Sequence, residues 1–320
     1  MQKARAACET GALTFTDTDH AEPANLAKRI KAAALHQEQS PILMDVLQLR
    51  VGADFRMTSQ QDTPAVFLIR PEGSAVQHLF HEIWLTEPHL PYRDYTDLYG
   101  NKCRRTILPA GTATISYDAY VEIGSELDPA DPSALEVPID EVPDEALVYT
   151  LPSRYCHSDI LFPRAAELFG NVEPGWERVA AICDWVHASL AFGYGSSNAA
   201  TTAADTLASG NGVCRDFAHL AISFCRALNI PARYAYGYLP DIDNVRITAP
   251  MDFAAWFEAY LGNRWWVFDP RNNVPRRGRV TVGRGRDALD VAMVTTFGNS
   301  VLDSMTVRAD RLENDARAFV

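Results

Sequence analysis

A glycine-flanked turn runs directly into an amphipathic segment, and a cysteine lies at their junction. The turn is Gly210-Asn211-Gly212, and Cys214 follows it closely. Asn229 and Pro231 give a stop signal further along. The apolar residues in between have helical spacing: Val213, Phe217, Leu220, Phe224 and Leu228. The pattern predicts a helix with Cys214 in its first turn and small residues on one side that allow close packing against a sheet.

A cysteine at the start of a helix has two interpretations. The unpaired N–H groups and the positive end of the helix dipole can stabilise a thiolate, which makes Cys214 a candidate nucleophile. The alternative is a buried structural thiol, a common environment for a free cysteine. The position alone leaves both open, so the decision depends on residues further along the chain.

Composition restricts the classes of partner. The 320 residues are 47% apolar and carry a formal net charge of −12. A general nucleic-acid or anionic-membrane partner needs clustered positive charge, so neither is expected. The arginine-rich run from Arg271 to Arg286 is interpreted as a solvated loop, and only secondarily as an anion site. No apolar run is long enough to span a bilayer, and the first residues lack an apolar signal core, so a cytoplasmic protein is expected.

The cysteines and histidines do not form a metal-binding pattern. No C-x-x-C pair is present, so we expect free thiols and neither a disulfide framework nor a zinc ribbon. His78, His81 and His89 are close in sequence, but no carboxylate or thiol completes a ligand set. On a regular strand His78 and His81 would face opposite sides. No metal or other cofactor is predicted. The six cysteines are at positions 8, 103, 156, 183, 214 and 225.

Four regions follow one another along the chain. Residues 1–40 have the composition of a disordered tail or a loose helix. In residues 41–123, period-two alternation and turn signals predict an antiparallel β-sandwich. Residues 124–145 are acidic and rich in proline, as in an extended linker. In residues 146–320 helices come first and strands follow, which predicts an α+β domain.

A tight hairpin is predicted around Gly262 and Asn263, between two aromatic-rich runs. If these two residues form the loop, the residue numbers of opposed positions sum to 525, so Asp269 faces Trp256. Position 254 then lies on the same face of the sheet, one diagonal step from Asp269. Such diagonal neighbours are roughly 7–8 Å apart. A carboxylate could orient an imidazole placed there, as a nucleophilic thiol requires.

Three segments in this half of the chain share a family pattern. The first comprises Gly212–Ala218 and Phe224–Tyr234, with Gly237-Tyr238 after it; the second is Ala255–Tyr260 and the third Trp265–Pro270. Together they resemble the core of the bacterial transglutaminase-like superfamily, whose members are relatives of papain-type cysteine enzymes. The β-rich segment of residues 44–123 resembles the region that often precedes this core. The resemblance implies a papain-like α+β domain in which the nucleophile helix packs on an antiparallel sheet. It also implies a Cys–His–Asp triad, with Cys214 as nucleophile and Asp269 as the orienting acid.

The sequence departs from the family at the histidine, whose place is taken by Ala254. Alanine cannot take a proton from the thiol or give one to a leaving amine, and such help is typically worth about 10²–10⁴-fold. His219 belongs to a different face of the predicted helix. His157 and His187 could fold near Cys214, but the sequence does not place them. Asp252 shares the strand face of position 254 and would be a poor activator of a thiol.

Two functions therefore remain open. The first, which we favour on sequence, is a cysteine hydrolase or acyltransferase that acts on amide or thioester bonds of a peptide, a protein or a small molecule. The second is a catalytically inactive relative that binds a peptide or protein partner in the former active-site cleft. Cys214 and Asp269 favour the first function, and Ala254 favours the second. Arg215 and Asp216 are expected to lock the turn by ion pairing.

Overall fold

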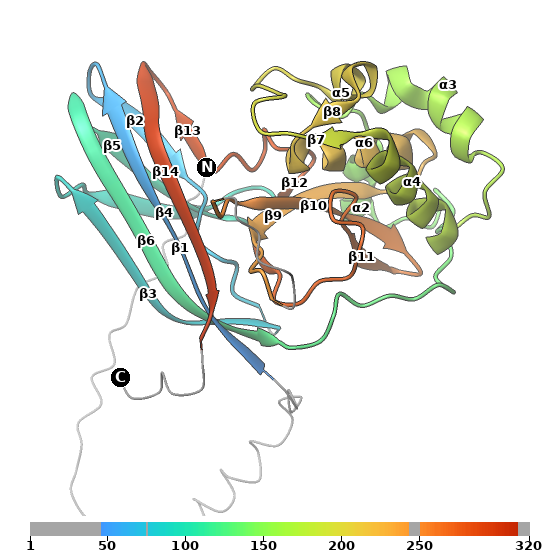
Figure 1. The fold of residues 1–320 in the computed structure, drawn as a ribbon, viewed down its shortest axis with the longest axis horizontal. Coiled ribbons are helices and arrows are strands. Elements are labelled where there is room, and N and C mark those ends of the chain that lie inside the picture. Colours follow the sequence, from blue (N-terminus) through green and yellow to red (C-terminus); the bar gives the residue numbers. More distant parts are fainter. Residues whose placement is uncertain (1–45, 75, 243–249, 313–320) are drawn as a thin grey trace, which may run out of the picture. The chain divides into compact units, whose positions relative to one another are not determined.

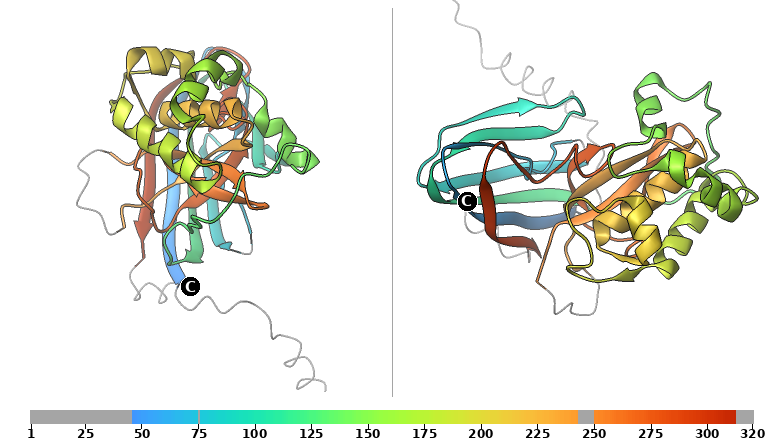
Figure 2. Two further views of the ribbon diagram at one scale, coloured as in Figure 1. Left: turned by 90° about the vertical axis from the view of Figure 1, so that its right-hand side faces the viewer. Right: turned by 90° about the horizontal axis from the view of Figure 1, so that it is seen from above.

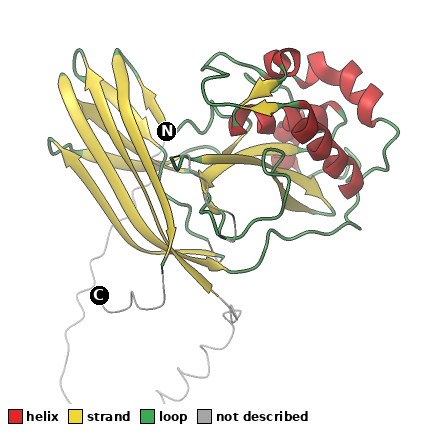
Figure 3. Ribbon diagram, viewed as in Figure 1, coloured by secondary structure: helices red, strands yellow, loops and turns green. Residues whose placement is uncertain are grey.

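The computed structural model describes residues 46–74, 76–242 and 250–312. The tail predicted for residues 1–40 lies outside these residues. In the described part, two sheets face each other as a sandwich, and a third sheet carries the helices (Figures 1 and 3). The fold is thus α+β, with a β-rich N-terminal region as predicted.

The sandwich consists of two four-stranded antiparallel sheets, ordered β14-β1-β6-β3 and β13-β2-β5-β4. Alternation explains the long strands: in β1 the residues Leu49, Val51 and Phe55 are fully buried, and polar residues separate them. The strands are β1 (Val46–Ser59), β2 (Thr63–Phe67), β3 (Gln77–Glu87), β4 (Tyr92–Thr96), β5 (Lys102–Leu108), β6 (Gly111–Gly124), β13 (Val294–Thr296) and β14 (Ser300–Arg311).

The last two strands correct the predicted extent of the second domain, which was placed at residues 146–320. β14 pairs with β1 along its length, and β13 pairs with β2. The chain therefore returns to the sandwich after the α+β part. Pairing between strands so far apart in sequence cannot be predicted locally, because the alternation of residues in a strand does not indicate which sheet edge the strand pairs with.

Residues 124–145, which were predicted to be an extended linker, make specific contacts with the α+β part. Asp128 forms an ion pair with Arg279 at 2.8 Å, and Glu136 forms one with Arg178 at 3.0 Å. Ala134 is buried as well. Two acidic residues of this segment are thus partners of arginines in the α+β part. A short helix, α2 (Asp144–Leu147), and one 3₁₀ turn, η1 (Val148–Thr150), follow.

The helices of the described residues lie over the α+β part, away from the sandwich sheets (Figure 2). Capping explains α5: Thr202 and Asp205 cap its start reciprocally, and Gly210 ends it with a φ of 70°. α3 was not predicted, and it contains Pro163. The helices are α3 (Ser158–Phe169), α4 (Trp176–Ser189), α5 (Ala203–Ser209) and α6 (Cys214–Ala227).

α6 packs against β9 and β10 of an antiparallel sheet ordered β11-β10-β9-β12. Phe217, Leu220 and Phe224 are buried, as their helical spacing predicts. This confirms the prediction that the helix carrying Cys214 packs on an antiparallel sheet. A two-stranded parallel pair, β7 with β8, precedes the helix. The strands are β7 (Ala191–Phe192), β8 (Asn211–Gly212), β9 (Ala232–Tyr238), β10 (Ala254–Leu261), β11 (Arg264–Phe268) and β12 (Val280–Gly285).

Two further predictions are corrected here. The arginine-rich run is no solvated loop, since it contains β12, and Arg276 and Arg279 are buried. His78 and His81 share one face of β3, because the register shifts by one residue between Leu79 and His81.

The sandwich and the α+β part share one continuous cluster of buried apolar side chains. Polar contacts join them too: the Tyr238 hydroxyl donates to the Ile69 carbonyl at 2.9 Å, and Gln77 exchanges hydrogen bonds with the Thr281 backbone. Across the described residues, every helix is too short or too polar to cross a membrane.

Candidate active site

The turn before α6 is fixed by hydrogen bonds, so the position of Cys214 is well defined. The Asp216 carboxylate accepts from the Val213 N–H at 2.9 Å and pairs with Arg215 at 2.9 Å. A Cβ at Gly212 would lie 2.7 Å from the Asp216 side chain, so only glycine fits there. The ion pair predicted to lock the turn is confirmed, and Cys214 is the first residue of the helix.

The Cys214 sulfur lies against the start of β10. It donates to the Phe253 carbonyl at 3.9 Å, and it accepts from the Ala255 N–H. The pairing of β10 with β11 ends at Phe257 and Phe268, so β11 does not cover this edge. The thiol therefore contacts the main chain on both sides of Ala254, which is where the family's histidine would stand.

Burial, the largest influence, raises the pKa of the Cys214 thiol to about 11. Four smaller influences act on the same pKa: the Ala255 N–H and Arg271 lower it, whereas Asp252 and Asp269 raise it. At pH 7 a thiol with this pKa is ionised only to about one part in 10⁴. Burial therefore favours the neutral thiol and opposes the thiolate that a helix N-terminus can stabilise.

Asp269 lies just beyond the predicted hairpin. The register is confirmed, since Phe257 faces Phe268 and Leu261 faces Arg264. The Asp269 carboxylate is buried and already engaged. It accepts from the Asn272 N–H at 3.0 Å and the Asn272 amide at 2.8 Å, and it pairs with Arg279 at 3.3 Å. None of its hydrogen bonds comes from an imidazole.

A cavity of about 190 Å³ lies over the thiol. Its lining brings Cys214 and Ala254 together, with Asp252 and Arg271 beside them. Asp269 is not part of the lining, although its neighbours Arg271 and Asn272 are. The apolar walls are Phe192, Tyr194, Val213, Leu239, Met251 and Phe253. The structure thus brings Cys214 and Ala254 together in one cleft, whereas Asp269, expected to face the thiol from the hairpin, lies outside the lining.

None of the other candidate histidines contacts Cys214 in the described part of the chain. His219 is fully buried, stacks on Tyr155, and accepts from the Ala288 N–H at 3.1 Å. Burial lowers its pKa to about 3, so it is neutral at pH 7. The Nδ1 atom of His187 lies 3.1 Å from the Arg271 carbonyl, and His157 precedes α3. His219 and His187 have structural partners elsewhere.

Sequence reasoning missed Arg271 and Arg279. Arg271 lines the cleft and lies over the Phe192 ring at 4.4 Å, and Arg279 neutralises Asp269. Both were read as part of a solvated loop. The position of Arg271, two residues after Asp269, was a usable signal, whereas the role of Arg279 depends on tertiary pairing with Asp128.

Comparisons with known proteins agree with this geometry. A model of the transglutaminase-like superfamily matches residues 163–270. A solved structure described as a "Putative Cysteine Protease from Cytophaga hutchinsonii" is 33% identical, covers 85% of this chain and 92% of that one, and has a TM-score of 0.78.

Two curated bacterial relatives are similar over shorter stretches. An uncharacterized protein of Mycobacterium leprae is 38% identical over 125 residues, which are 38% of this chain and 44% of the relative. One from Mycobacterium tuberculosis (strain H37Rv) is 32% identical over 174 residues, or 50% of this chain and 55% of the relative. The chain thus spans about half the length of these relatives.

Fold and site define a protein of the general cysteine hydrolase and acyltransferase type. The chain belongs to the transglutaminase-like superfamily.

Proposed function

We propose that this protein is a catalytically impaired member of the superfamily that binds a peptide or protein segment in the cleft over Cys214. One observation carries the proposal: the thiol contacts the backbone on both sides of Ala254, where an imidazole would have to stand. The scaffold of the active site is kept, and the group that moves the proton is missing.

Amide cleavage needs two proton transfers that this site cannot make. The thiol must lose its proton to attack, yet burial raises its pKa to about 11. The leaving amine must then gain a proton, and Ala254 has none to give. Asp252 is a carboxylate of the cleft lining, and burial raises its pKa too. A carboxylate beside a buried thiol opposes thiolate formation because both charges are negative.

The lining of the cleft favours binding of a peptide side chain. Phe192 and Tyr194 are substantially exposed, so the cleft offers aromatic surface to a partner. Arg271 adds one positive charge, and Asp241 and Asp252 add two carboxylates. Apolar walls with a few fixed polar groups are typical of ligand sites. The similar protein from Cytophaga hutchinsonii carries a protease description, which supports a peptide as the ligand class.

A second candidate function is acyl transfer from an activated ester or thioester. The Ala255 N–H favours this second function, because it donates to the sulfur and lowers the pKa of the thiol. A good leaving group departs without protonation, so the missing acid matters less. This activity would rise with pH as the thiol ionises toward a pKa of about 11.

The test restores the imidazole with Ala254→His and measures hydrolysis of fluorogenic peptide amides. Ala254→Gln is the size-matched control without a titrating group, and Ala254→His/Cys214→Ala removes the nucleophile. We expect Ala254→His alone to raise hydrolysis by about 10²–10⁴-fold. If the wild type already hydrolyses the peptides as fast as Ala254→His does, the proposal that the wild type is catalytically impaired is wrong.

Binding is tested separately by selecting peptides from a library on the wild-type protein. Ala254→Trp, which fills the cleft, is the counter-selection. Peptides that bind the wild type and are lost on Ala254→Trp support the proposal. A selection that yields the same peptides on both proteins contradicts it.

We also propose a cytoplasmic location. The five cysteines among the described residues are free thiols, which a reducing compartment maintains.

A further inference from the structure

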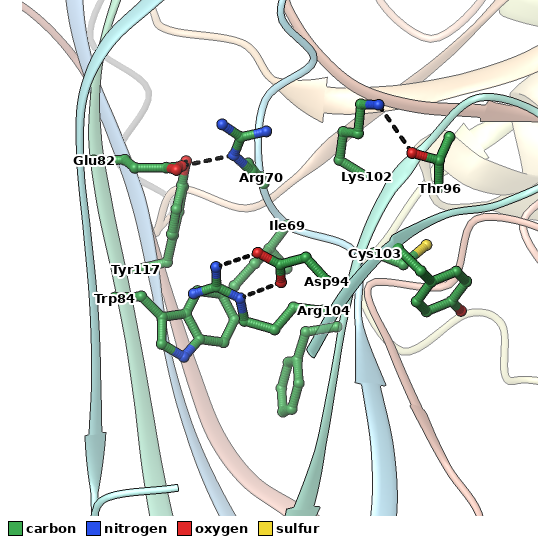
Figure 4. Close-up of a pocket in the computed structure, with 12 residues that line it drawn as sticks. Ile69, Arg70, Glu82, Trp84, Asp94, Thr96, Lys102, Cys103, Arg104 and Tyr117 are labelled. Carbon is green, nitrogen blue, oxygen red and sulfur yellow. Dashed lines mark hydrogen bonds and ion pairs between the residues drawn. The ribbon is translucent and has the colours of Figure 1, made fainter. Parts of the chain in front are cut away.

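The sandwich contains a second cavity, which shares no lining residue with the Cys214 cleft. Its volume is about 330 Å³. Side chains from both sheets line it, on the side where β3 and β4 are the edge strands (Figure 4). Cavities of this size hold small organic ligands.

The floor of this cavity is aromatic. The Trp84 ring packs against Phe67 and Tyr117, with centroid separations of 5.9 Å and 5.8 Å. Phe67 is buried and Trp84 is partly buried, so the floor is a rigid apolar surface. An apolar ligand group placed on it would be removed from water.

One pair of charges in the cavity is fully matched. Arg104 donates two hydrogen bonds of 2.7 Å to the Asp94 carboxylate. Its guanidinium also lies 3.6 Å from the Tyr92 centroid and 4.6 Å from that of Trp84. This locked group shapes the cavity wall and offers no net charge to a ligand.

Two other cations keep unused donors. Arg70 donates through Nε to Glu82 at 2.8 Å, and its two Nη groups donate to none of the described residues. Tyr117 donates to the same Glu82 oxygen at 3.0 Å. Lys102 donates to the Thr96 hydroxyl at 2.9 Å and forms no ion pair within the described ranges. In Figure 4, Arg70 and Lys102 lie above the Arg104–Asp94 pair and Trp84.

The charges lining the cavity therefore sum to one positive. Arg70, Arg104 and Lys102 face Glu82 and Asp94. Lys102 is also the only lysine after Lys31, in a chain that otherwise uses arginine. An exposed ammonium with spare donors, beside a guanidinium with spare donors, suits a carboxylate.

We propose that this cavity binds a small organic carboxylate with an apolar body. Arg70 and Lys102 hold the carboxylate, and the apolar body packs against the exposed part of Trp84, which Phe67 supports from below. This site is independent of the function proposed for the Cys214 cleft.

The experiment uses the full chain and two probes, phenylacetate and hexanoate, each with its neutral amide as the matched control. Reductive ¹³C-methylation labels the lysine side chains, keeps their charge and gives a few NMR signals. The signal that is missing in Lys102→Gln belongs to Lys102. We expect the carboxylates to shift that signal in a saturable way and the amides to leave it unchanged. Equal shifts from acid and amide would overturn the proposal, as would no saturable shift from either carboxylate.

Variants then locate the site by isothermal titration with the better carboxylate. Arg70→Gln should weaken binding about tenfold, the value of one charged hydrogen bond. Arg105→Gln is the matched control, because Arg105 is exposed on the same strand as Lys102 and outside the cavity lining. Cys214→Ala should bind like the wild type. Equal losses in Arg70→Gln and Arg105→Gln, or loss of binding in Cys214→Ala, would show that the carboxylate binds elsewhere.

Discussion

Strand β10 carries a buried carboxylate in its middle, and its start contacts a thiol whose pKa shifts in the opposite direction. In the middle of the strand, Glu258 is buried and pairs with Arg233 at 2.6 Å and Arg284 at 2.9 Å. At its start, the Cys214 thiol lies against residues 253–255, and the position between them is an alanine. The two sites are four residues apart on one strand, so the backbone that presents them is the same.

Glu258 and Cys214 differ in how far nearby charges compensate for their burial. Burial acts to raise the pKa of Glu258, but Arg284 and Arg233 outweigh it, and the net pKa is lowered. Burial also raises the pKa of Cys214, and no adjacent imidazolium opposes it. A buried group keeps its charge only where an opposite charge is close. Geometry inherited from an enzyme family therefore does not by itself preserve the chemistry of that family.

Glu258→Gln should produce the largest effect on stability. It leaves Arg233 without its buried partner, and breaking a buried pair costs about 3–5 kcal/mol. The free energy of unfolding, from denaturant titration, is the measurement. The control is Glu167→Gln, which removes the exposed pair with Arg164 and should change stability by no more than ~0.5 kcal/mol. Similar losses in both variants would mean that the buried cluster contributes no more than a surface pair.

Ala254→His should produce the next largest effect, now on thiol reactivity. An imidazolium that lowers the thiol pKa from about 11 to roughly 7 raises the thiolate fraction at pH 7 by nearly 10⁴-fold. The weaker nucleophilicity of the less basic thiolate offsets this by roughly 10²-fold, so a net gain of about 10²-fold is expected. Modification of Cys214 by a small disulfide reagent, followed by peptide mass spectrometry, measures it.

The size-matched variant Ala254→Gln separates charge from packing in that experiment. It should change the rate less than about threefold, since a neutral amide does not stabilise a thiolate as an imidazolium does. If Ala254→Gln accelerates the reaction as much as Ala254→His, solvent access and not proton transfer limits the thiol. The difference between Cys214 and Glu258 would then depend on packing and not on charge.

Local signals explain which parts of this fold the sequence predicted. α5 and α6 were predictable because caps, Gly210 and helical spacing act within a few residues. The β10–β11 hairpin was predictable because a two-residue loop fixes the register of both strands. These elements indicated Cys214 as a candidate nucleophile and the place of Asp269, while the triad roles and the histidine position held by Ala254 came from the family resemblance.

The features that sequence reasoning missed depend on distant partners. β14 pairs with β1 across most of the chain, and no local pattern selects that edge. Arg284 was assigned to a loop because its partners, Glu258 and Glu72, come together only in the folded state. The high pKa of Cys214 is similarly invisible in the sequence, since burial causes it.

His219 is a buried base, and like Cys214 it has a pKa that burial shifts toward the neutral form. Burial lowers its pKa to about 3, below the ordinary 6.5. The folded state therefore binds fewer protons than the unfolded state in this range, so stability is present above pH 6.5 and falls toward pH 3. Between pH 6.5 and 5 the loss should be ~2 kcal/mol. Denaturant titrations at both pH values measure it, and His219→Gln should remove this part of the pH dependence. A wild type and variant with parallel pH profiles would show that His219 is not the group responsible.

Asp269→Asn should have the smallest effect on the reactivity of Cys214 in the wild-type chain, because the carboxylate has no imidazole to orient. Its charge is balanced by Arg279, and Arg279 would keep Asp128 at 2.8 Å after the change. Asp269 raises the pKa of Cys214 only as the last of five influences, so the variant should speed the reaction with the disulfide reagent less than about threefold. In the Ala254→His chain the same substitution should remove most of the gained hydrolysis, because the new imidazole then depends on Asp269 for its orientation. A large effect of Asp269→Asn without the histidine would mean that the carboxylate still controls the thiol, and that the start of β10 retains more of its charge chemistry than Ala254 implies.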